Sequence, residues 1–292
     1  MGFLPENIKR AIAEMGAGAQ PEINKATKAL LGPLLEKYDD VIETLDISYA
    51  DHPRQRMDIY STANLKDAPV VIYIPGGGFT GGDKRQDDRF FGNVGRFFAK
   101  RGVVAVTGNY RLAPEFTWPT AAQDVASIVR WVKENIYRFG GDATKIIIFG
   151  HSAGASHAGS FVFDPELRGH EEVRGAILSS GLFVLRSSEM RPNVAQYFGS
   201  DETTFERRSA LSHVAGTKIP VLLTVAEFDP VPLATPTFDL AIALTRRDGR
   251  PPKLMWLEDH NHYSCISSVG TCDTRYSGAI LEFVQQVSRN GS

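Results

Sequence analysis

The stretch GHSAG at positions 150–154 carries the clearest chemical signal in the chain. The apolar run KIIIF at positions 145–149 comes directly before it, and a segment of small residues that permits a helix follows. A serine flanked by small residues in a tight turn between a strand and a helix projects its hydroxyl above the sheet, as in a nucleophile elbow. The pattern predicts that Ser152 is a nucleophile. The alternative is a glycine-rich turn whose serine only caps the next helix.

A nucleophilic serine needs a base to take its proton and a carboxylate to orient that base. The elbow predicts the chain order serine, carboxylate, histidine. Asp229 follows the apolar run at positions 221–226, where a loop leaves the carboxyl end of an expected strand. Ligands bind at this edge of open parallel sheets. We predict Asp229 as the orienting carboxylate, and Glu227, two residues earlier, is its rival.

The base is expected after the last apolar run, at positions 253–257. Two histidines, His260 and His262, follow that run. His262 is preferred because it lies deeper in the loop that precedes the final helix. One helix and one strand fit between Asp229 and His262, as this order requires. The predicted catalytic residues are therefore Ser152, Asp229 and His262.

Acyl transfer also needs donors for the oxyanion, and backbone N–H groups commonly supply them. The sequence PGGG at positions 75–78 follows the apolar run at 70–74. Consecutive glycines let the backbone approach a substrate closely. Gly77, Gly78 and Ala153 are the predicted oxyanion-hole donors. A phosphate-binding loop is the competing interpretation, but neither the GxxxxGK[ST] nor the GxGxxG pattern is present.

The elements that must position these residues alternate along the chain. An antiparallel hairpin is expected around positions 45–59. The later strands are expected at 70–74, 103–106, 146–149, 175–178, 221–225 and 253–257. Helices are expected near 90–100, 121–137, 153–163, 238–247 and 278–287. Apolar strands that alternate with helices predict an α/β fold with a mostly parallel, eight-stranded sheet and helices on both faces.

Two segments lie outside this alternation. Residues 1–40 show helical periodicity, and residues 183–217 separate two strands without a clear strand pattern. A structureless connection of that length is uncommon in a compact domain. We expect a single domain over residues 1–292, with 1–40 and 183–217 forming a small helical lid.

Composition excludes several other classes. The 292 residues include 32 Lys and Arg against 34 Asp and Glu, a net charge of −2, without the basic clusters typical of nucleic-acid binding. Because no apolar run is long enough to span a membrane and no signal core is visible, we expect a cytoplasmic protein without a membrane partner. Cys265 and Cys272 are expected to be reduced, and their spacing with nearby histidines fits no common metal site.

Four stretches in this order resemble the hormone-sensitive-lipase-like carboxylesterases, a family of the α/β-hydrolase fold. They are PGGG at 75–78, YRLAPE at 110–115, GHSAG at 150–154 and the pair Asp229 and His262. YRLAPE is the most specific of the four, and the resemblance covers roughly residues 45–285.

The resemblance implies hydrolysis of short-chain esters through an acyl-enzyme on Ser152, without a cofactor or metal, and a lid built from the two irregular segments. It also implies a structural role for Asp124. The family usually has histidine where this chain has Pro75, so the support of the glycine loop must differ, because proline has no N–H.

The substrate is a small-molecule ester in this interpretation, and the protein is a monomer or a homodimer. Aromatic residues near the motif loops are candidates for the substrate pocket: Phe79, Trp118, Phe183, Phe228 and Tyr263. The same triad would also serve an arylformamidase or amidase. A hydrolase fold that binds ligands without turnover is a third hypothesis.

Overall fold

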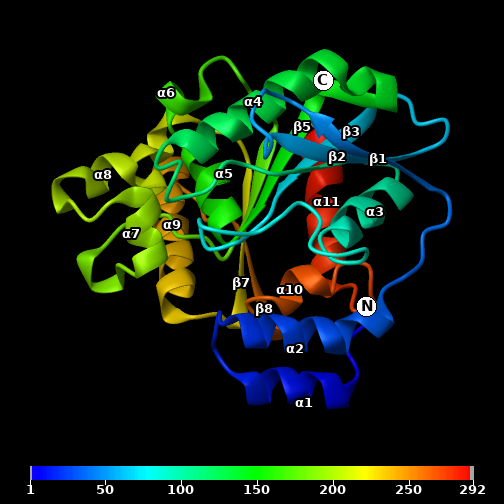
Figure 1. The fold of residues 1–292 in the computed structure, drawn as a ribbon, viewed down its shortest axis with the longest axis horizontal. Coiled ribbons are helices and arrows are strands. Elements are labelled where there is room, and N and C mark those ends of the chain that lie inside the picture. The colour runs from blue at the N-terminus through cyan, green and yellow to red at the C-terminus, as the bar shows by residue number, and fades with distance from the viewer. Residues whose placement is uncertain (1, 290–292) are drawn as a thin grey trace.

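The structure, a computed structural model, describes residues 2–289. An eight-stranded sheet crosses it in the order β1-β2-β4-β3-β5-β6-β7-β8 (Figure 1). The strands are β1 (Val41–Ser48), β2 (Arg56–Thr62), β3 (Ala68–Ile74), β4 (Val104–Gly108), β5 (Gly141–His151), β6 (Gly175–Ser179), β7 (Val221–Phe228) and β8 (Lys253–Asn261). Strands β1 and β2 are antiparallel to their neighbours, and the others pair in parallel. The predicted α/β-hydrolase sheet is confirmed.

Helices connect and cover the strands. The α-helices are α1 (Glu6–Met15), α2 (Pro21–Leu31), α3 (Gly92–Lys100), α4 (Thr120–Asn135), α5 (Ala153–Phe163), α6 (Pro165–Arg168), α7 (Pro192–Phe198), α8 (Phe205–Arg208), α9 (Val231–Asp248), α10 (Ser264–Ser267) and α11 (Arg275–Arg289). Short 3₁₀ turns are η1 (Gly32–Leu34), η2 (Ile136–Phe139), η3 (Ser187–Glu189), η4 (Glu202–Thr204) and η5 (Ala210–Gly216). Within residues 2–289, none of the helices has the length and apolar character needed to cross a bilayer.

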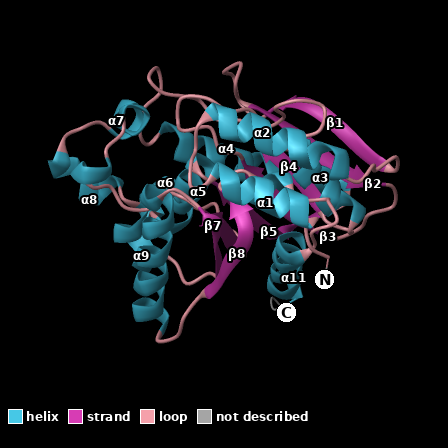
Figure 2. Cartoon of the chain, turned by 90° about the horizontal axis from the view of Figure 1, so that it is seen from below, coloured by secondary structure: helices cyan, strands magenta, loops and turns pink. Residues whose placement is uncertain are grey.

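The central strands are apolar on both faces because helices cover both (Figures 1 and 2). In β3, Val70 and Ile72 pack in the cluster that includes α4, α5 and α9. Val71 and Tyr73 point the other way, into the cluster that includes α3 and α11. This alternation follows from the two-residue period of a strand. The resulting two-sided core fixes the carboxyl ends of β5, β7 and β8, from which the candidate site residues emerge.

One helix begins earlier than predicted. The sequence predicts a helix at 238–247, whereas α9 starts at Val231 and contains Pro236. Proline is readily accommodated in the first turn of a helix, as Pro232 is here, because that turn has no internal acceptor for the missing N–H. Packing then overrides the cost of the second proline, since Pro236 is buried.

The N-terminal helices lie side by side below the sheet (Figure 1). Ile8, Ile12 and Leu31 of these helices form a small cluster with Leu4, which precedes α1, and Phe228 of β7 packs against this cluster. Lys9 of α1 forms an ion pair with Asp259 of β8 at 3.3 Å. Residues 1–40, as far as described, are therefore attached to the ends of β7 and β8.

Residues 183–217 fold into η3, α7, η4, α8 and η5, on the side of α9 away from α3 (Figure 1). The backbone N–H of Trp118 donates to the carbonyl of Tyr197 in α7 at 2.9 Å. Arg207 of α8 binds the carboxylates of Asp164 and Glu166. These contacts attach the segment to the α4 and α5 side of the sheet.

Asp124 of α4 is fully buried and lies outside the candidate site. Its carboxylate accepts hydrogen bonds from the Gln55 amide at 2.8 Å and from the backbone N–H of Arg111 at 2.8 Å. The Arg111 guanidinium also donates to it, at 2.7 Å. These bonds tie the YRLAPE segment and Gln55, the residue before β2, to α4.

We predict that Asp124→Asn lowers the free energy of unfolding by about 2–3 kcal/mol, because it removes charged hydrogen bonds from a buried acceptor and leaves Arg111 unpaired. Urea denaturation would measure the change. Asp142→Asn, which removes a partly exposed pair with Lys145, is the control and should cost less than about 1 kcal/mol. Equal effects of the two substitutions would contradict a structural role for Asp124.

Candidate active site

Ser152 lies in a strained turn between β5 and α5. Its backbone has φ 55° and ψ −126°, outside the favoured regions for a residue with a side chain. Close packing explains the flanking glycines: a Cβ on Gly150 would lie 2.5 Å from the Cα of Ala155, and one on Gly154 would lie 2.0 Å from the carbonyl oxygen of Ile74. The predicted strand–turn–helix geometry of a nucleophile elbow is present.

The structure brings Ser152, His262 and Asp229 together. His262 Nε2 lies 2.9 Å from Ser152 Oγ, and His262 Nδ1 lies 2.7 Å from Asp229 Oδ1. Asp229 is buried, with 5% of its surface exposed. Its second oxygen accepts hydrogen bonds from the Ser180 hydroxyl at 2.6 Å and from the Ala226 backbone N–H at 2.7 Å. Ser180 is a site residue that sequence reasoning did not identify.

The rival residues have other partners. Glu227 is exposed, and its carboxylate accepts a hydrogen bond from the backbone N–H of Asp259 at 2.8 Å. His260 is fully buried and lies 3.2 Å from the carboxylate of Asp273. Side chains two positions apart share a face of the sheet only while the strand continues. Strand β7 ends between Glu227 and Asp229, and β8 ends between His260 and His262, so the members of each pair point in different directions. Both strands end in this region, so sequence spacing alone could not separate the candidates.

The loop that carries the base is held by the N-terminal segment. The side-chain oxygen of Asn261 accepts hydrogen bonds from the backbone N–H groups of Tyr263 at 3.0 Å and Ser264 at 2.8 Å. Its amide nitrogen donates to the Thr27 hydroxyl of α2 at 3.0 Å. The Tyr263 hydroxyl donates to the carbonyl of Ala19 at 2.6 Å. An asparagine at the start of a turn can be recognised from the local sequence. Its partner on α2, Thr27, cannot, because it is far away in the chain.

His151 supports the base from behind. Its Nε2 donates to the backbone carbonyl of His262 at 2.9 Å, and the two rings lie 4.8 Å apart. Burial, followed by the proximity of His262, lowers the pKa of His151 to about 3. His151 therefore stays neutral and serves as a fixed donor. The Cys265 thiol donates to the same carbonyl at 3.3 Å.

The glycine loop leaves donors free beside Ser152. Gly78 has φ +61°, and a Cβ on Gly77 would lie 1.9 Å from the carbonyl oxygen of Gly81. Across the described part of the chain, the backbone N–H groups of Gly77, Gly78 and Ala153 have no hydrogen-bond acceptor. Ala153 opens α5, whose first N–H groups have no partner inside the helix. The three predicted oxyanion donors thus share one cavity with the serine.

Other contacts replace a histidine at the position of Pro75. The Tyr110 hydroxyl donates to the Pro75 carbonyl oxygen at 2.9 Å. Phe79 stacks on Tyr197, with centroids 5.4 Å apart, and His157 packs against the edge of Phe79 at 5.4 Å. The Tyr110 hydroxyl and an aromatic cluster therefore hold the loop, and neither contact requires a side-chain donor at position 75.

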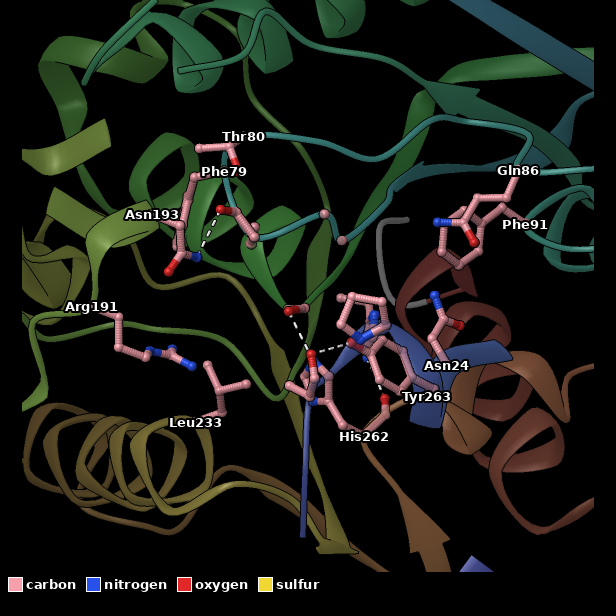
Figure 3. Close-up of a pocket in the computed structure, with 18 residues that line it drawn as sticks. Asn24, Phe79, Thr80, Gln86, Phe91, Arg191, Asn193, Leu233, His262 and Tyr263 are labelled. Atoms are coloured by element: carbon pink, nitrogen blue, oxygen red, sulfur yellow. Dashed lines mark hydrogen bonds between the residues drawn. The ribbon is translucent and has the colours of Figure 1, made fainter. Parts of the chain in front are cut away.

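A cavity of about 470 Å³ opens on Ser152 (Figure 3). Figure 3 shows Asn24, Gln86, Phe91 and Tyr263 on one side of His262, and Arg191, Asn193 and Leu233 on the other. Both irregular segments of the sequence thus contribute lining residues.

Of the predicted pocket residues, Phe79 and Tyr263 line this cavity, and the others do not. Phe183 is fully buried against Gly181 and Gly159. The guanidinium carbon of Arg207 lies over the Trp118 ring, 5.1 Å from the ring centroid. The structure therefore corrects the prediction for these side chains, which tertiary packing directs into the core and toward α8. Phe228 packs instead with the N-terminal helices.

Among residues 2–289, no group of three or more His, Cys, Asp or Glu side chains is placed to hold a metal ion. Cys265 is buried and Cys272 is exposed, and both are free thiols.

The fold is that of an α/β-hydrolase. A family description, BD-FAE, matches residues 57–162. The chain is 28% identical over 265 residues to the esterase LipQ of Mycobacterium tuberculosis, covering 83% of this chain and 62% of that protein. It is 39% identical over 129 residues to the probable carboxylic ester hydrolase LipM of the same organism, covering 42% and 29%. The chain thus spans less than two thirds of these relatives.

Solved structures show the same fold. Esterase B from Lactobacillus rhamnosis aligns with a TM-score of 0.76 at 17% identity, covering 97% of this chain and 94% of that one. The hyperthermophilic esterase from Pyrobaculum calidifontis aligns at 0.72 and 21%, covering 98% of both chains. Together these similarities fit the hormone-sensitive-lipase-like family of α/β-hydrolases, and the resemblance predicted from the motifs is confirmed.

The buried His157 predicts a pH dependence of stability. Burial lowers the pKa of His157 to about 3, so the unfolded chain takes up a proton between about pH 6.5 and 3 that the folded chain does not bind. Stability therefore falls as the pH falls through this window. His157→Phe should reduce the slope by up to about 1.4 kcal/mol per pH unit. Urea denaturation at several pH values would measure it.

His151 remains in that variant and should preserve part of the slope. The exposed His170 provides a control, since His170→Gln should show the same dependence of stability on pH as the wild type. An unchanged slope in His157→Phe would show that His157 is not held neutral in the folded protein.

Proposed function

We propose that this chain is a serine carboxylesterase that hydrolyses small carboxylic esters through an acyl-enzyme on Ser152. The observation that carries the proposal is the continuous hydrogen-bonded series Ser152–His262–Asp229, which ends in a cavity with free backbone donors. The names of the relatives, esterase and carboxylic ester hydrolase, agree with it.

In the first half of the reaction, Ser152 Oγ attacks the ester carbonyl carbon as His262 Nε2 takes the hydroxyl proton. The carbonyl oxygen becomes an oxyanion, which the N–H groups of Gly77, Gly78 and Ala153 stabilise; a donor of this kind contributes about 3–4 kcal/mol. The tetrahedral intermediate then collapses and the bond to the alcohol oxygen breaks. The proton on His262 passes to that oxygen, and the alcohol leaves.

In the second half, water attacks the acyl carbon while His262 Nε2 takes one of its protons. The intermediate collapses, the bond to Ser152 Oγ breaks, and the proton returns to the serine as the acid is released. Asp229 keeps the Nδ1 proton of His262 in place and stabilises the imidazolium formed in each half.

We also propose that residues 1–40 and 183–217 act as the lid of this site. The support is that Asn24 and Arg191, one from each segment, line the cavity, on opposite sides of His262 in Figure 3. A cavity of about 470 Å³ bounded in this way suits small soluble esters better than long-chain lipids.

Burst kinetics with p-nitrophenyl acetate test the acyl-enzyme. The wild type should gain the mass of one acetyl group in quenched samples, whereas Ser152→Ala should not and should lose kcat on the order of 10⁶-fold. Ser127→Ala on α4, away from the site, is the matched control. Unchanged turnover in Ser152→Ala would refute the mechanism, and faster turnover of N-formylkynurenine than of the aryl ester would assign the formamidase alternative.

The identity of the orienting carboxylate can be tested separately. Asp229→Asn should lower kcat by about 10⁴-fold, because the amide no longer holds His262 in the required tautomer. Glu227→Gln should retain kcat within a few fold, since the Glu227 carboxylate accepts a hydrogen bond from the backbone N–H of Asp259 and not from His262. Steady-state rates on the same ester distinguish the two residues, and the reverse pattern would make Glu227 the functional carboxylate.

A further inference from the structure

We propose that this cavity selects esters that carry a carboxylate, and that Arg191 is the residue that binds the anionic group. The proposal rests on the esterase function above and names its substrate class. The observation behind it is that the Arg191 guanidinium lines the cavity, and no acceptor for it is found within residues 2–289.

Arg191 differs from the other arginines of residues 183–217. Arg186 pairs with Asp239 at 2.7 Å, Arg207 binds Asp164, and Arg208 donates to the carbonyl of Phe198. For Arg191, no hydrogen bond or ion pair of the side chain is found within residues 2–289, and its Nε is buried without an acceptor. A guanidinium presents its donors in a planar fork that matches the two oxygens of a carboxylate. A carboxylate in the cavity would therefore be a suitable partner for Arg191.

The cavity contains no charge that would oppose an anion. Its lining includes neither Asp nor Glu, and Arg191 is its one lysine or arginine among the described residues. The nearest carboxylate of the site, Asp229, lies behind His262, and both of its oxygens have donors. Glu189, two residues before Arg191, faces Arg186 at 3.6 Å.

The backbone at Arg191 is held in place relative to the oxyanion loop. Asn193, two residues later, donates through Nδ2 to the carbonyl of Gly78 at 2.9 Å. Tyr197, one helical turn further, stacks on Phe79. Figure 3 shows the Arg191 side chain directed toward the centre of the cavity, between Asn193 and Leu233. A carboxylate bound there would have a defined position relative to the scissile carbonyl at Ser152.

The opposite side of the cavity is neutral. Asn24 and Gln86 offer amides, and Phe91 and Tyr263 offer aromatic surface. Lys28 is a cation next to this side of the cavity, but its ammonium donates to Gln86 and lies over the rings of Phe90 and Phe91. Lys28 therefore provides a control cation on the side that the proposal leaves neutral.

Kinetics on paired esters test the proposal. The pairs are monomethyl adipate with methyl hexanoate, where the charge is in the acyl part, and 4-acetoxybenzoate with its methyl ester, where it is in the alcohol part. The wild type should favour the anionic member of at least one pair in kcat/KM, and the favoured pair shows which part of the ester reaches Arg191. Arg191→Met should reduce the anionic-to-neutral ratio by about 10- to 100-fold, and Arg191→Lys should reduce it less.

Arg186→Met and Lys28→Met are the controls and should keep the ratio of the wild type. A ratio that responds to Lys28→Met and not to Arg191→Met would overturn the proposal. So would a wild type that favours the neutral member of both pairs.

Binding separates this proposal from the proposed function. Calorimetric titration of Ser152→Ala with the same esters needs no turnover. Tighter binding of the anionic ester that is lost in Ser152→Ala/Arg191→Met supports the site, even if the wild type proves inactive and the esterase function fails. Equal binding of anionic and neutral esters would overturn the site and leave the esterase function standing.

Discussion

The buried carboxylate of Asp229 is the constraint on which the rest of the site depends. A carboxylate removed from water is costly unless donors satisfy its oxygens. Here Ser180, directly after β6, and the N–H of Ala226 in β7 supply two donors, and His262 supplies the third. Because these groups come from the ends of different strands, the burial of this carboxylate depends on the parallel sheet, which also sets the position of His262.

The serine and the oxyanion loop are fixed by a second set of contacts. The positive φ of Ser152 is maintained by close packing of Gly150 and Gly154, where a side chain would clash with backbone. The glycine loop is held by the Tyr110 hydroxyl, which donates to the Pro75 carbonyl oxygen, and by the rings around Phe79. Preorganisation of this kind lets the N–H groups face a developing charge without reorganising. These contacts hold the loop although position 75 is a proline, which has no N–H to donate.

The two irregular segments connect the fold to substrate choice. The N-terminal helices brace the loop of His262 through Asn261 and Tyr263, and α7 contacts the oxyanion loop through Asn193. Each segment therefore touches both the cavity and a loop that carries catalytic groups in the proposed mechanism. Arg191 places a positive charge on one side of the cavity, and attack by a serine nucleophile does not by itself require that charge.

Local patterns in the sequence determined the sheet, its antiparallel start and the order of the candidate triad, because strand periodicity, glycine turns and motif order are encoded in neighbouring residues. The same patterns left Glu227 as a rival of Asp229 and His260 as a rival of His262. Only the points at which β7 and β8 end in the structure distinguish the members of each pair. Tertiary packing decided the start of α9 and placed Trp118 and Phe183 away from the cavity. It also brought Ser180, His151 and Arg191 to the site. Those positions depend on contacts between segments far apart in the chain, which no local pattern specifies.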